Sequence, residues 1–187
     1  MNKKIFIVTG HNEHKGGASG TYKGKRYTEY DIATDWTRQI YNSLAGSYPI
    51  ELIDNKSLTE KVKEINNNNP LFAIELHFNS NVNASGSETL HFPNSSKGIR
   101  LAKLVQEEFN RVDIFQPDRG VKPGYFYNEY GEANGIVYFL RKTKCPSVLI
   151  EPEFMSNIEN IFNYQEEGMS CIENAIIEFY NILEDEL

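Results

Sequence analysis

Four side chains in this chain of 187 residues have types and positions that suit metal-assisted hydrolysis. His11 and His77 each follow an apolar run, and Glu151 lies at the end of a third apolar run. Glu29 lies at the start of a helical pattern. A catalytic zinc site takes three ligands from histidine, glutamate or aspartate and leaves one position open for water. A partly buried carboxylate beside such a site has a raised pKa, which general acid–base catalysis near neutral pH needs.

Each candidate also has a simpler interpretation. A histidine after a strand is often an ordinary loop residue, and the helix dipole favours a glutamate such as Glu29 in a first turn. His77 can be a buried histidine that has found a polar partner. Glu151 precedes Pro152, which disfavours continuation of a central strand, and carboxylates are common at strand ends. The residues alone leave both interpretations open.

Apolar runs and helical periodicity predict the elements that position these residues. Apolar residues recur every four positions from Ile32 to Leu44, and Thr28 can cap this helix. Ser57 and Glu60 form a capping box that predicts a second helix. The further helices are expected at 98–109, from about 157, and in a final stretch through Cys171, Ala175, Phe179 and Ile182. The predicted strands are 5–8, 50–53, 71–78, 88–92, 136–140 and 148–150.

Strands that alternate with helices along the whole chain predict a layered α/β fold with a largely parallel or mixed sheet. The length fits a single domain. Sites in such folds gather just past the strand ends. We therefore expect His11, His77 and Glu151 to converge on one edge of the sheet.

Composition limits the classes of partner. The net charge is −7 and no block of lysine and arginine occurs, so nucleic acid is excluded as a partner. No stretch approaches the roughly 20 apolar residues of a membrane span. The apolar run 5–8 is shorter than the roughly 7–15 residues of a signal-peptide core. We therefore expect a protein made in the cytoplasm without a signal peptide, with both cysteines reduced.

Six short segments occur in an order that resembles the zinc-dependent N-acetylmuramoyl-L-alanine amidases. That family comprises bacterial cell-wall amidases and many phage endolysins, and the resemblance runs from Ile5 to the final helix. The segments are Thr9-Gly10-His11, Thr28-Glu29-Tyr30, Glu75-Leu76-His77-Phe78-Asn79-Ser80, Gly86-Ser87-Glu88-Thr89, Leu140-Arg141-Lys142-Thr143, and residues 146–157 around Ile150-Glu151-Pro152.

The resemblance implies a fold, a cofactor and a reaction. It implies a three-layer α/β fold whose mixed sheet of about six strands is flanked by helices. His11, Glu29 and His77 would bind Zn²⁺, and Glu151 would be the catalytic carboxylate. The substrate would be peptidoglycan, cleaved at the amide between N-acetylmuramic acid and L-alanine of the stem peptide. His14 is expected to be a loop residue and His91 to face the surface, and neither is expected to bind the metal.

Four features depart from the family pattern or bear on the biological setting. Many members have Asp-Pro-Gly-His-Gly-Gly at the first ligand, whereas this chain has Thr9-Gly10-His11-Asn12. Glu153 stands where glycine is common and adds charge near Glu151. Residues 1–187 are expected to form one catalytic domain without a wall-binding module. The missing signal peptide favours a phage or prophage endolysin, which reaches the wall after release, over a host autolysin.

Two other functions remain as alternatives. A cysteine peptidase acting on stem peptides would use Cys145, whose pKa nearby lysines would lower, or Cys171, which falls on an apolar helix face. A non-catalytic peptidoglycan-binding module would keep the fold without the chemistry. An aromatic stretch either shapes a substrate groove or packs in the core, and it contains Phe115, Tyr125, Phe126, Tyr127, Tyr130 and Tyr138.

Overall fold

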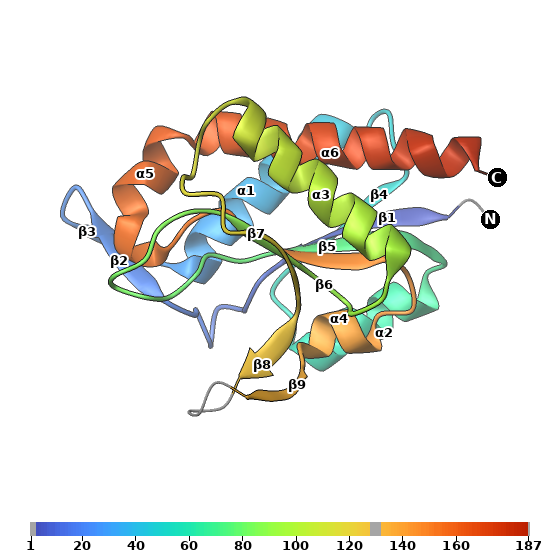
Figure 1. Ribbon diagram of the computed structural model, residues 1–187, viewed down its shortest axis with the longest axis horizontal. Coiled ribbons are helices and arrows are strands. Elements are labelled where there is room, and N and C mark those ends of the chain that lie inside the picture. The colour runs from blue at the N-terminus through green and yellow to red at the C-terminus, as the bar shows by residue number, and fades with distance from the viewer. Residues whose placement is uncertain (1–2, 128–131, 187) are drawn as a thin grey trace.

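A mixed sheet of six strands forms the centre of the computed structural model, which describes residues 3–127 and 132–186 (Figure 1). In spatial order the strands are β4 (Ile50–Ile53), β1 (Lys4–Thr9), β5 (Pro70–Leu76), β10 (Ser147–Glu151), β6 (Glu88–His91) and β7 (Gly120–Pro123). The first four of these strands are mutually parallel. β6 is antiparallel to β10 and parallel to β7. The predicted mixed sheet is thereby confirmed.

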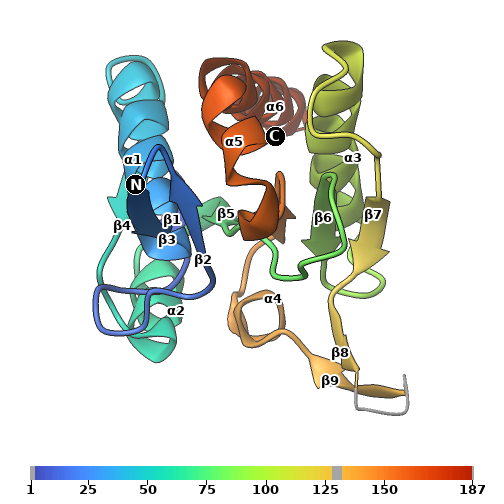
Figure 2. The ribbon, with the colours of Figure 1, turned by 90° about the vertical axis from the view of Figure 1, so that its left-hand side faces the viewer.

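Helices cover both faces of the sheet (Figure 2). One layer holds α1 (Glu29–Leu44), α3 (Ser96–Arg111) and α6 (Gln165–Asp185). The other layer holds α2 (Leu58–Asn67) and α4 (Tyr138–Lys142). A 3₁₀ turn, Met155–Asn157, and the short helix α5 (Ile158–Asn163) connect β10 to α6. This arrangement is the three-layer α/β fold that the resemblance implied.

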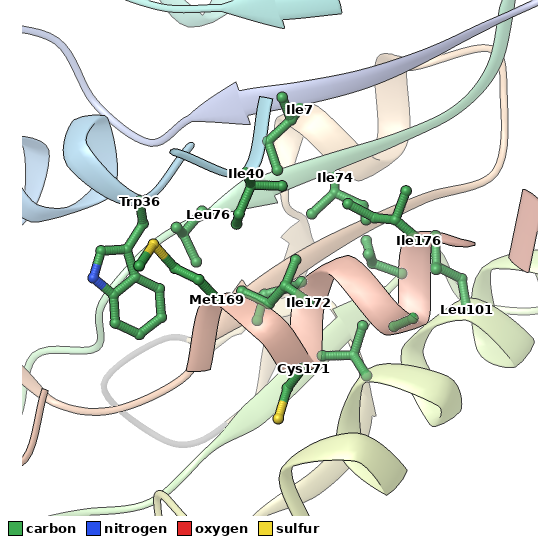
Figure 3. Packing of buried hydrophobic residues seen from close by; sticks show 14 of the residues in the cluster. Ile7, Trp36, Ile40, Ile74, Leu76, Leu101, Met169, Cys171, Ile172 and Ile176 are labelled. Atoms are coloured by element: carbon green, nitrogen blue, oxygen red, sulfur yellow. The ribbon is translucent and has the colours of Figure 1, made fainter. Parts of the chain in front are cut away.

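The central strands carry apolar side chains on both faces because both faces are covered. In β1, Ile5 and Ile7 join the core beneath α1, α3 and α6, whereas Phe6 and Val8 pack toward α2 and α4. Figure 3 shows the larger core, in which Cys171 of α6 lies among apolar side chains. Cys171 is 2% exposed, which confirms that it is a core residue.

Capping boxes begin the two helices where the sequence predicts them. The Thr28 hydroxyl accepts from the Asp31 amide at 3.2 Å, and the Asp31 carboxylate accepts from the Thr28 amide at 2.7 Å. Ser57 and Glu60 form the same reciprocal pair at the start of α2. Because α1 therefore begins at Glu29, that carboxylate lies in the first helical turn.

The prediction of a strand at 136–140 is wrong. β9 (Ala133–Ile136) ends where the predicted strand begins, and Tyr138–Lys142 forms α4. A short apolar run does not distinguish a strand from a buried helical turn, and here Phe139 and Leu140 are buried on the α2 side of the sheet.

No helix in the described ranges is long and apolar enough to cross a membrane.

Two hairpins occupy segments for which the sequence predicted no strand. β2 (Ser19–Tyr22) and β3 (Lys25–Thr28) are joined by Lys23 and Gly24, which both have positive φ, as tight hairpin turns require. β8 (Tyr125–Tyr127) pairs with β9, and this second hairpin extends below α4 in Figure 1. Both hairpins are short, so neither has enough alternation to be recognised from sequence.

Candidate metal centre and active site

The carboxyl ends of three neighbouring strands bring the predicted site residues together. His11 follows β1, His77 directly follows β5, and Glu151 is the last residue of β10. The His77 amide donates to the carbonyl of Ile150 at 2.9 Å, which places His77 beside Glu151. Because these strands are parallel, their carboxyl ends share one edge of the sheet. The convergence that the sequence predicted is confirmed.

Glu29 lies between the two histidines. Its Oε2 is 3.0 Å from His11 Nε2, and its Oε1 is 2.7 Å from His77 Nδ1. The amides of Ala18 and Phe78 also donate to this carboxylate, which is only 4% exposed. Burial opposes ionisation, but the hydrogen bonds from the two histidines outweigh it and lower the pKa of Glu29 to about 2.

The His77 ring lies between the carboxylates of Glu29 and Glu75. Burial alone would lower its pKa, but Glu75 and then Glu29 outweigh burial and raise the pKa of His77 to about 10. The centroids of the His77 and His11 rings are 4.9 Å apart and their planes are inclined at 71°. The two imidazoles therefore lie edge to face, with the Glu29 carboxylate in contact with both.

These three side chains fit a divalent metal. One donor atom from each of His11, Glu29 and His77 lies within 4.8 Å of the others. Two imidazole nitrogens and one carboxylate oxygen are ligands that zinc accepts, and three protein ligands leave a coordination position open. Glu29 contacts both rings, one through each carboxylate oxygen, and so holds the three donors close together.

Two glycines permit this close approach. A Cβ on Gly10 would lie 2.5 Å from the Leu76 carbonyl oxygen and 2.9 Å from the His77 ring, so a side chain there would displace a proposed ligand. Gly17 has a φ of +77°, and a Cβ on it would collide with Glu29 and His11. The loop between β1 and β2 can cover the ligands only because these positions lack side chains.

Glu151 has the properties of a proton carrier. Its Oε2 is buried and has no hydrogen-bond partner among the described residues. Burial raises the pKa of Glu151 to about 8, and the acidic residues Glu29, Glu88 and Glu75 add to that effect, while His77 opposes it. A carboxyl group with a pKa near neutrality can both accept and donate a proton at physiological pH.

A cavity of about 420 Å³ opens onto these residues. His11, His77 and Glu151 line it together with Lys61 and Glu75. Its remaining walls are apolar or aromatic and come from α2, the β8–β9 hairpin, α4 and neighbouring strands: Leu58, Leu90, Tyr125, Phe126, Val137, Tyr138, Phe139 and Leu149. The lining therefore combines titratable side chains with apolar and aromatic ones.

Only part of the aromatic stretch reaches this cavity. Tyr125, Phe126 and Tyr138 line it. Phe115 does not, because it is 1% exposed and packs against Trp36 and Phe109 in the larger core. The backbone of Tyr127 belongs to β8, and Tyr130 lies outside the described residues.

Lys61 and Glu75 are site residues that the sequence analysis missed. They are 1% and 2% exposed and lie in the cavity beside the histidines. Burial lowers the pKa of Lys61, although Glu75 opposes this shift. Two sequence signals exist: Lys61 lies four residues before Ile65 on the buried face of α2, and Glu75 interrupts an apolar strand.

Glu153 has a structural environment of its own. It is fully buried, and its Oε1 accepts from the amides of Gly86 and Phe154, both at 2.8 Å. Its Oε2 accepts from the side-chain amides of Asn157 and Asn160. These bonds tie the segment before β6 to the turn after β10. The glutamate that replaces the common glycine therefore acts as a link between loops.

The remaining histidines differ from each other. His14 is an exposed loop residue, as expected. The expectation that His91 faces the surface is wrong, because it is 7% exposed and its Nδ1 lies 2.9 Å from the Phe92 carbonyl oxygen. Strand alternation places His91 on the same face as Thr89, which bonds to Gln106 of α3.

Neither cysteine has the environment of a nucleophile. Burial raises the pKa of the Cys145 thiol to about 12 and that of the Cys171 thiol to about 11. The expected lowering of the Cys145 pKa by nearby lysines is therefore wrong. A protonated thiol is a poor nucleophile, so the cysteine peptidase alternative loses its basis.

Comparisons with known proteins agree with this geometry. The N-acetylmuramoyl-L-alanine amidase family model matches residues 5–178. The chain is 25% identical over 192 residues to the N-acetylmuramoyl-L-alanine amidase LytC of Bacillus subtilis (strain 168). That match covers 96% of this chain but only 36% of LytC, so the chain spans little more than a third of this relative.

Solved structures share the fold. The catalytic domain of CwlV, an N-acetylmuramoyl-L-alanine amidase from Bacillus (Paenibacillus) polymyxa var. colistinus, matches with a TM-score of 0.78 at 22% identity, covering 96% of this chain and 99% of that one. The catalytic domain of the CD27L endolysin targeting Clostridia Difficile matches with a TM-score of 0.71 at 24% identity, covering 95% and 96%. The family model covers the four proposed site residues, His11, Glu29, His77 and Glu151. This chain belongs to the N-acetylmuramoyl-L-alanine amidase family.

Proposed function

We propose that this protein is a zinc-dependent peptidoglycan hydrolase that cleaves the amide between N-acetylmuramic acid and L-alanine of the stem peptide. The observation that carries the proposal is the position of Glu151, a buried carboxyl with a pKa of about 8 in the same cavity as His11 and His77. Membership in the amidase family and the likeness to LytC support the choice of bond.

The proposed ligands of the zinc ion are His11, Glu29 and His77, whose donor atoms lie within 4.8 Å of one another. When bound, zinc would act as a Lewis acid that polarises the substrate carbonyl and acidifies the attacking water. The lactyl carbonyl of N-acetylmuramic acid, which forms the scissile amide with the nitrogen of L-alanine, would meet this edge of the sheet.

Glu151 would move the proton that amide hydrolysis requires. An unactivated amide needs a nucleophile and a protonated leaving nitrogen. The unpartnered Oε2 of Glu151 is free to accept the proton of the attacking water and deliver it to the departing alanine amine. Its raised pKa suits both steps, because neither protonation state is strongly favoured near pH 8.

The aromatic wall of the cavity would contact the substrate. Tyr125, Phe126 and Tyr138 line the same cavity as His11 and His77. Aromatic rings pack against the faces of sugars and against peptide side chains, and tyrosine adds a hydroxyl for hydrogen bonding. This wall supports peptidoglycan as the partner, with recognition made by the catalytic domain itself.

The non-catalytic alternative is less well supported. A module that only binds peptidoglycan has no need for a buried carboxyl with a raised pKa beside three convergent metal ligands. Perturbed titratable groups in a cleft are typical of catalytic sites. A zymogram on purified cell wall separates the two functions, because a binding module produces no cleared band.

The bond that is cut provides the direct test. Digestion of purified peptidoglycan is expected to release new L-alanine amino termini and glycan strands with free lactyl carboxylates, but no new reducing sugar ends. The reason is that one metal and one proton carrier suit amide hydrolysis, whereas glycosidases use paired carboxylates around a glycosidic oxygen. Mass spectrometry of the products checks this. New amino termini from any other stem or bridge residue contradict the amidase assignment.

Zinc binding is expected to release at least one proton per chain at pH 7. In the metal-free chain the His77 pKa is about 10, so its ring is protonated, and a ligand nitrogen must lose that proton. The apparent affinity for zinc therefore rises with pH until the ring is deprotonated without the metal.

Isothermal titration calorimetry in buffers of different ionisation enthalpy counts the released protons. His14→Gln, which alters an exposed histidine, is the control and should release the same number. A binding enthalpy that is equal in all buffers would contradict the protonated state of His77.

We further propose that residues 1–187 form one catalytic domain and that the protein is a phage or prophage endolysin acting on the wall after release. The family model over residues 5–178 supports the single catalytic domain. An endolysin should lyse the bacterium that expresses it only once the membrane is permeabilised. Lysis without permeabilisation would favour a host autolysin.

A further inference from the structure

Two oppositely charged side chains lie buried beside the proposed ligands and have no part in the amide chemistry. Lys61 of α2 is 1% exposed and Glu75 of β5 is 2% exposed. Burying a charge is costly unless the charge is paired or hydrogen-bonded. Replacing a buried ion pair with apolar residues is often neutral or stabilising, so stability alone does not explain the pair.

Glu75 contacts the side of the His77 ring that is turned away from Glu29. Its Oε2 lies 3.4 Å from His77 Nε2, whereas His77 Nδ1 lies 2.7 Å from Glu29 Oε1. A neutral imidazole carries its proton on one nitrogen and offers the other to a metal, and the partner of its N–H group decides which. If Glu75 accepts from the N–H group of His77, the ring proton lies on Nε2, and Nδ1 is available to bind the metal.

Lys61 connects this carboxylate to the first ligand. Its Nζ lies 3.8 Å from Glu75 Oε1 and donates to the carbonyl of His11 at 2.6 Å and to that of Thr9. The ammonium group therefore compensates the charge of Glu75 and holds the backbone on both sides of Gly10. Through this pair, α2 contacts the segment that carries His11 and the ring of His77.

We propose that Glu75 is a positioning residue that fixes the tautomer and orientation of His77, with Lys61 as its buried counter-ion. Carboxylates that accept from the free N–H of a metal-bound histidine raise its basicity and orient its ring. The inference rests on the metal site of the proposed function and is independent of which bond the enzyme cleaves.

Two double variants isolate the hydrogen bond from the charges. K61M/E75Q and K61M/E75L both remove the two charges, so neither leaves an unpaired buried ion. They differ in that the glutamine oxygen can still accept from His77 Nε2, whereas leucine cannot. Zinc affinity, measured by competition with a chromogenic chelator, is expected to be roughly 10–100-fold weaker in K61M/E75L than in K61M/E75Q. Equal affinities in the two folded variants would overturn the positioning role.

A measurement on the unaltered chain keeps the proposal testable if a variant fails to fold. In the zinc-loaded protein, ¹⁵N NMR of the His77 ring is expected to show the proton on Nε2. A proton on Nδ1 overturns the proposal, as does a chain that binds no zinc.

Neither measurement uses peptidoglycan, so this inference and the amidase assignment can fail separately. Zinc binding with the expected tautomer but without release of L-alanine termini would support the positioning role and refute only the proposed reaction.

Discussion

Glu151→Gln is expected to reduce kcat/KM on peptidoglycan by roughly 100-fold or more while the chain keeps its fold and its zinc. Glutamine has nearly the same shape as glutamate but cannot accept and return a proton. Because the pKa of Glu151 is about 8, its carboxyl is mostly uncharged at pH 7, and the neutral glutamine changes the charge of the site little. The variant should therefore be about as stable as the unaltered chain at neutral pH.

The measurement is the rate of release of L-alanine termini by zinc-replete protein, with zinc content determined on the same sample. Glu13→Gln is the matched control, since Glu13 is an exposed carboxylate two residues after His11 and does not line the cavity. It should retain nearly full activity. Near-normal turnover by metal-replete Glu151→Gln would exclude Glu151 as the proton carrier.

His77→Ala is expected to lose the metal and the activity together. The unaltered chain should bind about one zinc ion, and removal of one of three protein ligands should leave almost none after dialysis. Removing the His77 ring also takes away one partner of Glu29 and one of Glu75, while His11 still contacts Glu29 and Lys61 still contacts Glu75. A loss of stability is expected for that reason, because each buried carboxylate loses part of the interaction that offsets its desolvation.

Elemental analysis and the peptidoglycan assay test this on the same preparation, and circular dichroism verifies the fold. His14→Ala is the control, because His14 is an exposed neighbour of the site that no proposed contact uses. Stoichiometric zinc in folded His77→Ala, or activity without zinc, would refute the ligand assignment. The contrast with Glu151→Gln separates the residue that binds the metal from the residue that moves the proton.

The sequence by itself predicted the elements whose signals are local. Both capping boxes are formed within four consecutive residues, so Thr28 and Ser57 indicated where α1 and α2 begin. The central strands are buried on both faces, and this makes them short apolar runs that stand out in the chain. The four proposed site residues were recognisable for a similar reason, since each lies in a short motif next to a strand or helix end.

Elements whose conformation depends on their neighbours were not predictable in this way. Residues 138–142 carry apolar side chains that suit a strand as well as a helical turn, and packing on the α2 side of the sheet selects the helix. His91 is buried because α3 covers its face of β6. Phe115 is buried because it packs against Trp36 and Phe109 in the core. Trp36 and α2 lie far from these residues in the sequence, so a local window of sequence does not contain them.

The tertiary structure alone decided what surrounds the candidate site. Lys61 lies on a helix and Glu75 on a strand, and only the docking of α2 against the sheet brings them to the two histidines. The pKa of Glu151 is raised by burial, and burial depends on the packing around the residue rather than on residue type. Sequence motifs therefore identified the groups that can do chemistry, whereas packing of distant segments set their protonation, their orientation and the cavity in which they act.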